Sequence, residues 1–112
     1  GGRIRPETHS SVGAKTAAEV ADYNATLAFI GTNGASLEGG ITSFDTDESQ
    51  VKKIMMRQAN ERILLADSGK FGIAYPAKFA NFGDFDRVVT NVDIEQQYLD
   101  KFSSAGVDVA LA

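Results

Sequence analysis

The sequence predicts an α/β fold with a mostly parallel sheet and helices on both faces. Strand-like and helix-like segments alternate along the 112 residues, as expected for parallel strands joined by right-handed crossovers. The apolar run at residues 26–30 shows no polar alternation, which is typical of a strand covered on two sides. Polar loops directly follow this run and a later one, at the edge where such sheets bind ligands.

The first half of the chain supplies the first of these strands. Residues 3–8 favour a short extended piece, and residues 10–13 favour a loop. Residues 14–23 are helix formers whose apolar side chains recur at helical spacing, so a helix is expected there. After the strand at residues 26–30, a glycine-rich loop is expected over residues 31–45.

The middle of the chain predicts a helix, a strand and a second polar loop. Asp45 or Asp47 can cap the helix, which is expected to end near Asn60. A strand at residues 62–66 then leads into the polar loop at residues 67–72.

The last third of the chain begins with residues 73–86, where no clear pattern is visible. A third strand is expected at residues 87–91 and a helix at residues 94–105. Gly106 stands where a helix often ends on a glycine, and a last strand is expected at residues 107–110.

Composition and charge exclude several classes of function. A net charge of −4 argues against gripping nucleic acid through its phosphates. The absence of cysteine rules out disulfides and thiolate metal sites, and the one histidine, His9, cannot build a histidine-rich site. No apolar run approaches the roughly 20 residues of a membrane span. We therefore predict no metal, no cofactor and no membrane contact.

The chain fits a single domain over residues 1–112, with 43% hydrophobic and 23% charged residues. It begins with Gly1-Gly2-Arg3 rather than methionine, so we expect a fragment of a longer protein.

The polar loops contain the candidate binding groups. Asp67, Ser68 and Lys70 place an acid, a hydroxyl and a cation at a strand end, where Lys70 could pair with a phosphate. A solvated turn capped by Asp67 is the simpler alternative. The glycine-rich loop lacks the spacing of a dinucleotide-binding fingerprint, and a plain turn is its alternative reading. Lys52 lies on the following helix, where most lysines are only solvated.

Five stretches, in order, resemble the C-terminal sensor domain of DeoR-family bacterial transcriptional repressors: SSVG, AFIGTNGASLEGGIT, QVKKIM, ILLADSGKFG and RVVTN. The resemblance covers nearly the whole chain. It implies a Rossmann-like fold similar to ribose-5-phosphate isomerase, and a phosphorylated sugar or polyol as effector. It also implies a cytoplasmic homo-oligomer that binds operator DNA through a separate N-terminal helix-turn-helix domain, not through this domain.

The resemblance further implies a ligand-binding set drawn from three loops and one helix. Its members are Ser10, Ser11, Gly13, Gly31, Thr32, Asn33, Gly34, Gly40, Thr42, Lys52, Asp67, Ser68 and Lys70. Two departures from the family pattern are visible, since Ala14 stands where proline is common and Gln50 where glutamate is common. Neither change removes a phosphate donor.

Two other functions remain open at this stage. The ADSGK run is similar to a substrate-binding run of ribose-5-phosphate isomerases, so an isomerase-like enzyme is one alternative. Such an enzyme needs a positioned base, and residues 31–35 hold no carboxylate where the isomerases have an acidic run. We therefore predict no catalytic residue and no enzyme activity. The other alternative is an oligomerisation module that binds no ligand.

Overall fold

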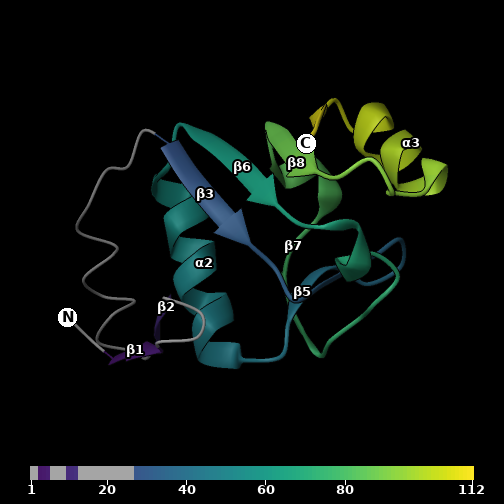
Figure 1. The fold of residues 1–112 in the computed structure, drawn as a ribbon. Coiled ribbons are helices and arrows are strands. Elements are labelled where there is room, and N and C mark those ends of the chain that lie inside the picture. Colours follow the sequence, from purple (N-terminus) through teal and green to yellow (C-terminus); the bar gives the residue numbers. More distant parts are fainter. Residues whose placement is uncertain (1–2, 6–9, 13–26) are drawn as a thin grey trace.

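A computed structural model describes residues 3–5, 10–12 and 27–112 of the chain (Figure 1). Its strands are β1 (Arg3–Arg5), β2 (Ser10–Val12), β3 (Leu27–Gly31), β4 (Gly34–Ser36), β5 (Gly40–Ser43), β6 (Glu61–Leu65), β7 (Ala77–Ala80), β8 (Arg87–Thr90) and β9 (Asp108–Leu111). Its helices are α2 (Thr46–Gln58) and α3 (Gln96–Ser104), with short 3-10 turns η1 (Ser68–Lys70) and η2 (Phe82–Asp84). The helix expected at residues 14–23 lies outside the described residues.

The central element is a four-stranded parallel sheet in the order β3-β6-β8-β9. Gly31 pairs with Leu65, and Leu65 pairs with Val89, so three strands end at nearly the same level. This arrangement confirms the α/β fold class and the expected parallel sheet. Because all the strands run one way, the segments that follow them emerge at one edge.

One face of this sheet carries most of the described core. Alternate residues Ala28, Ile30, Leu64 and Val88 are buried, in one cluster with residues of both α2 and α3. The strands follow each other in chain order, so right-handed crossovers bring both helices to the same face. On the opposite face, Phe29 keeps 55% of its surface exposed. Helices on both faces were expected, whereas α2 and α3, the helices described, both pack on the first face.

The expected loop at residues 31–45 is wrong in its middle, because two strands form there. β4 and β5 make an antiparallel hairpin, and β5 also pairs with β7 to form a second, three-stranded sheet. Gly40 adopts φ 74° at the start of β5, a conformation that suits glycine. Ala35 and Ile41 pair across the hairpin and are fully buried, so packing against distant residues overrides the loop-like composition.

The expected loop at residues 10–13 is also wrong in part. Ser10–Val12 form β2, which pairs antiparallel with β1. The pairing partner lies upstream, so local composition alone did not reveal it.

The helix ends follow the sequence closely. Asp45 caps α2, since its carboxylate accepts hydrogen bonds from the Asp47 and Glu48 amides at 2.9 and 3.3 Å. Gly106 follows α3 with φ 78°, as its position predicted. None of the helices described is long and apolar enough to cross a membrane.

Candidate functional site

A cavity of about 400 Å³ lies at the carboxyl edge of the parallel sheet. It is bounded by the ends of β3, β6 and β8 and by the turn after β6. The residues that line it are Gly31, Thr32, Leu65, Ala66, Asp67, Lys70, Val89, Thr90, Asn91 and Ala112. Four residues of the predicted binding set, Gly31, Thr32, Asp67 and Lys70, therefore converge here from separate loops.

The turn at residues 67–71 folds on its own hydrogen bonds. The Asp67 carboxylate accepts from the Gly69 amide at 2.9 Å, and the Asp67 carbonyl accepts from the Lys70 amide at 3.1 Å. The Phe71 amide donates to the Ser68 carbonyl at 3.3 Å. Asp67 thus caps the turn, as its alternative reading suggested. Because these amides already have acceptors, the groups left for a ligand in this turn are side chains.

Asn91 holds Ser68 in place from the neighbouring strand. The Ser68 amide donates to Asn91 Oδ1 at 2.6 Å, and Asn91 Nδ2 donates to Ser68 Oγ at 3.0 Å. The sequence prediction missed Asn91 as a site residue. Asn91 directly follows the apolar strand β8. The other candidates were chosen as polar residues just after an apolar strand, and the same criterion applied to β8 would have found Asn91.

Two further groups at this edge have unused hydrogen-bonding capacity within the described part of the chain. The Lys70 ammonium group forms no ion pair there. The Thr90 hydroxyl is buried without a hydrogen-bond partner. A buried hydroxyl without a partner costs about 1–3 kcal/mol of stability. A polar ligand or a water molecule that bonded to the Thr90 hydroxyl would remove this cost.

The polar side chains of the hairpin are used within the fold. The Thr32 hydroxyl lies 2.8 Å from the Thr42 carbonyl and 2.9 Å from the Gly34 carbonyl. The Thr42 hydroxyl donates to the Gly34 carbonyl at 3.2 Å and accepts from the Tyr75 amide at 3.0 Å. Asn33 Oδ1 accepts from the Phe44 amide at 3.3 Å. These groups fix the hairpin beside the cavity.

Three of the four predicted glycines are described, and they differ in what surrounds them. A Cβ added at Gly31 would meet nothing within 4 Å, so its surroundings are open toward the cavity that it lines. A Cβ at Gly34 would lie 2.5 Å from the Ile73 carbonyl oxygen, and one at Gly40 would lie 2.8 Å from the Ala80 carbonyl oxygen. The close approach of other backbone atoms therefore explains why glycine occupies positions 34 and 40. Gly31 differs, because a side chain there would have free space.

Lys52 does not line the cavity. Its ammonium group pairs with Glu48 at 3.2 Å and lies 5.1 Å from the centre of the Phe79 ring. Burial lowers the pKa of the Lys52 ammonium, and this effect exceeds the opposing effect of the Glu48 carboxylate. The structure thus gives Lys52 a packing and ion-pair role within α2 and β7.

The first predicted loop is only partly described. Ser10 and Ser11 belong to β2, which lies beside α2. Gly13 lies outside the described residues.

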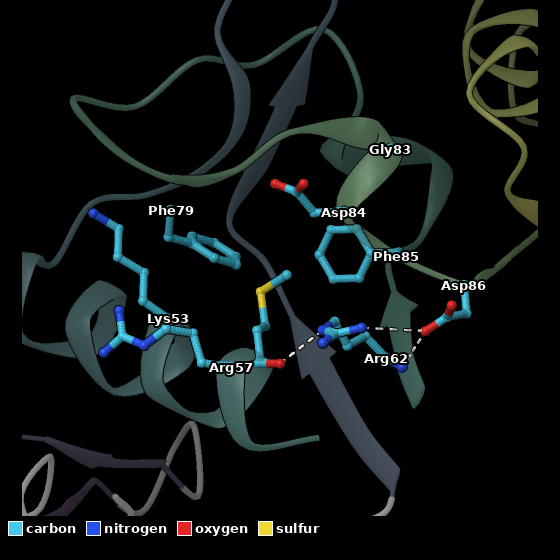
Figure 2. A pocket seen from close by; sticks show the side chains of 9 residues that line it. Lys53, Arg57, Arg62, Phe79, Gly83, Asp84, Phe85 and Asp86 are labelled. Carbon is cyan, nitrogen blue, oxygen red and sulfur yellow. Dashed lines mark hydrogen bonds and ion pairs between the residues drawn. The ribbon is translucent and has the colours of Figure 1, made fainter. Parts of the chain in front are cut away.

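A second cavity, of about 470 Å³, lies at the opposite, amino-terminal edge of the sheet (Figure 2). Arg62 crosses its side, where Nε donates to the Met56 carbonyl at 2.6 Å and Nη1 lies 3.7 Å from Asp86. The Asp86 carboxylate also accepts from the Arg62 amide at 2.8 Å. These bonds tie the end of α2 to β6 and β8, so the contacts seen here are structural.

The described residues include no group of three or more histidine, cysteine, aspartate or glutamate side chains placed to hold a metal ion.

Comparison with known proteins identifies the family. The sequence matches the family model of the DeoR C-terminal sensor domain over residues 1–92. It is 31% identical over 109 residues to the HTH-type transcriptional regulator GlpR of Haloferax volcanii. This alignment covers 97% of the chain and 43% of that regulator. It is 30% identical over 112 residues to the HTH-type transcriptional regulator IolR of Bacillus subtilis, with coverage of 100% and 45%.

A further match, 33% identical over 73 residues, is the deoxyribose operon repressor of Escherichia coli, with coverage of 65% of this chain and 29% of that protein. The chain belongs to the DeoR C-terminal sensor-domain family, a family of ligand-sensing regulatory domains. It spans less than half the length of the relatives named here.

Proposed function

We propose that this domain binds a phosphorylated sugar or polyol at the carboxyl edge of its parallel sheet. The observation that carries the proposal is a pair of donors on the turn beside the cavity: the Lys70 ammonium, on a residue that lines the cavity, and the Ser68 hydroxyl, which is bonded to the lining residue Asn91. Both groups donate hydrogen bonds, and a cation next to a hydroxyl favours a phosphate oxygen. In the described residues, Lys70 forms no ion pair that would compete for such a ligand.

The sugar or polyol would occupy the rest of the cavity. Gly31 leaves room for it, and the Asp67 carboxylate and the Asn91 amide offer partners for hydroxyl groups. The hairpin residues Asn33, Gly34, Gly40 and Thr42, and Lys52 on α2, would support these loops from behind. We keep Ser10, Ser11 and Gly13 in the proposed site on the sequence resemblance alone.

Binding would act on DNA through the whole protein. An effector that binds one arrangement of the sensor more tightly than another shifts the population between them. In a cytoplasmic homo-oligomer, this shift would change how a separate N-terminal domain engages operator DNA. The acidic charge of this chain fits such a division, because DNA binding is then left to another domain.

A thermal melt of the full-length protein against a panel of sugar phosphates tests the proposal. Each phosphate is paired with its unphosphorylated parent. A ligand at a hundred times its Kd stabilises the folded state by about 2.7 kcal/mol, so the melting temperature should rise by several degrees with one phosphate and not with its parent.

Variants locate the binding group. Lys70→Met should abolish the shift, whereas the matched control Lys101→Met, an exposed lysine on α3, should preserve it. A flat panel on a folded protein would contradict the proposal, as would a full shift in the Lys70→Met protein.

The arrangement does not favour an isomerase. Asp67 is the one carboxylate among the described residues that line the cavity, and it already accepts from the Gly69 amide as a cap. An isomerase needs a positioned base, and residues 31–35 hold no carboxylate that could act with Asp67. A coupled isomerase assay with the sugar phosphate found in the panel should therefore show no turnover.

A further inference from the structure

Asn91 is bonded to Ser68 at both ends of its side-chain amide. The oxygen end accepts from the Ser68 amide at 2.6 Å, and the nitrogen end donates to Ser68 Oγ at 3.0 Å. The nitrogen end also lies 3.4 Å from Asp93 Oδ2. One side chain from the end of β8 thereby fixes both the backbone and the hydroxyl of a residue on the turn after β6.

The surroundings of Asn91 allow only one orientation of the amide. Its oxygen faces a donor, the Ser68 amide, and its nitrogen faces two acceptors, the Ser68 hydroxyl oxygen and the Asp93 carboxylate. Reversing the amide would set donor against donor at Ser68 N and acceptor against acceptor at Asp93. The Asn91 amide is thus fixed as a donor toward Ser68 Oγ.

This orientation determines what the Ser68 hydroxyl can offer. Since Ser68 Oγ accepts a hydrogen bond from Asn91, its own proton points elsewhere. No acceptor for that proton occurs among the described residues. The turn therefore presents two donors, the Ser68 hydroxyl and the Lys70 ammonium, which together match a ligand group that accepts hydrogen bonds.

We propose that Asn91 is a positioning residue of the effector site, which directs the Ser68 proton toward the ligand and so selects an oxyanion such as phosphate. This inference rests on the proposed function, because it concerns the same cavity. A neutral sugar hydroxyl is a weaker partner for two donors of which one is charged. Asn91 thus contributes to the preference for the phosphorylated form without contacting the phosphate itself.

The test measures the affinity of the full-length protein for inorganic phosphate, which probes the oxyanion contact alone. Isothermal titration compares the wild type, Asn91→Ala, Ser68→Ala and the double variant. Loss of a hydrogen bond to a charged group weakens binding by roughly tenfold or more. We expect this loss for Asn91→Ala and for Ser68→Ala, and little further loss when both are combined, because Asn91 acts through the Ser68 hydroxyl.

A second variant keeps the fold of the turn. Asn91→Asp retains an acceptor for the Ser68 amide but removes the donor to Ser68 Oγ, and its carboxylate would capture the hydroxyl proton. It should bind phosphate at least as weakly as Asn91→Ala. The matched control is Asn60→Asp, which makes the same charge change at an exposed residue after α2 and should leave the affinity within about twofold, since well-exposed distant charges are screened.

The outcomes separate this inference from the proposed function. Wild-type affinity in the Asn91→Ala and Asn91→Asp proteins would overturn the positioning role and leave phosphate binding intact. The inference would also fail if Asn91→Ala weakened phosphate binding by the same factor in the wild type and in the Ser68→Ala protein. Such additive losses would mean that Asn91 acts independently of the Ser68 hydroxyl, through a general loosening of the turn. A wild-type protein that binds neither phosphate nor any sugar phosphate would overturn the proposed function first, and this inference with it.

Discussion

Gly34→Ala should destabilise the domain, whereas Gly31→Ala, three residues earlier, should not. A Cβ at Gly34 would lie 2.5 Å from the Ile73 carbonyl oxygen and 3.1 Å from Thr42 Oγ1. The first contact involves backbone, so β4 or the segment at Ile73 must move. That movement also disturbs the bonds from Thr42 Oγ1 to the Gly34 carbonyl and from the Tyr75 amide to Thr42 Oγ1.

The cost of this movement follows from the behaviour of overpacked interiors. Forcing a methyl group into a filled site costs about 1–3 kcal/mol. For a domain of this size that corresponds to a fall in melting temperature of roughly 4–12 °C. At Gly31 the added methyl group meets nothing within 4 Å, and φ is not in the left-handed region. Alanine at this position reduces the conformational entropy of the unfolded chain. The free energy of unfolding of Gly31→Ala should therefore stay unchanged or rise by up to about 1 kcal/mol.

Thermal denaturation followed by circular dichroism measures both variants, and denaturant unfolding gives the free energies. The pair also separates folding from binding, because the Gly31 methyl group would project beside the cavity at the end of β3. We expect Gly31→Ala to fold normally and to lose the shift with a sugar phosphate. Equal melting temperatures for the two variants would refute the reasoning from close backbone approach at Gly34.

Two ion pairs give further predictions. Glu48→Gln should lower the free energy of unfolding by about 3–5 kcal/mol, because it leaves the Lys52 cation buried, and Lys52→Met should also destabilise, because it leaves the Glu48 carboxylate buried. Replacing both residues with apolar ones of similar size should be nearly neutral. Since burial holds the pKa of Lys52 in the folded protein below the ordinary lysine value of 10.5, the unfolded chain binds this proton more tightly. The stability of the wild type relative to Lys52→Met should therefore rise as pH increases toward 10.5, which denaturant titrations at several pH values measure. Asp86→Ala should cost about 1 kcal/mol through loss of the bond from the Arg62 amide, and Asp86→Asn should cost less because it keeps an acceptor there. Equal costs for the two Asp86 variants in the same titrations would show that charge, not the hydrogen bond, matters.

The sequence was sufficient for the parallel sheet because the strands at residues 26–30, 62–66 and 87–91 are short, apolar and followed by polar turns. That pattern depends on local composition, and β3, β6 and β8 lie within a residue or so of the predicted bounds in the described part. The cap by Asp45 is also local, since its acceptor and donors lie within three residues. Local information thus located the edge at which the cavity lies.

The hairpin β4–β5 could not be predicted in the same way. Its glycines indicate a loop locally, but the pairing with β7 joins residues more than 30 positions apart. Burial of Ala35 and Ile41 depends on that distant strand and on α2. The role of Lys52 is hidden for a similar reason, because a lysine next to Glu48 and Phe79 is distinguished from a solvated one only when α2 packs on β7.

The difference between Thr42 and Ser68 shows what the structure adds to a prediction of binding residues. Both are hydroxyl residues in or near glycine-containing polar segments after apolar strands, so the sequence selects both. Thr42 Oγ1 both donates to the Gly34 carbonyl and accepts from the Tyr75 amide, and the residue is 1% exposed. Ser68 Oγ accepts from Asn91 and has no described acceptor for its proton. Thr42→Val should therefore damage folding, whereas Ser68→Ala should leave the melting temperature nearly unchanged and weaken phosphate binding.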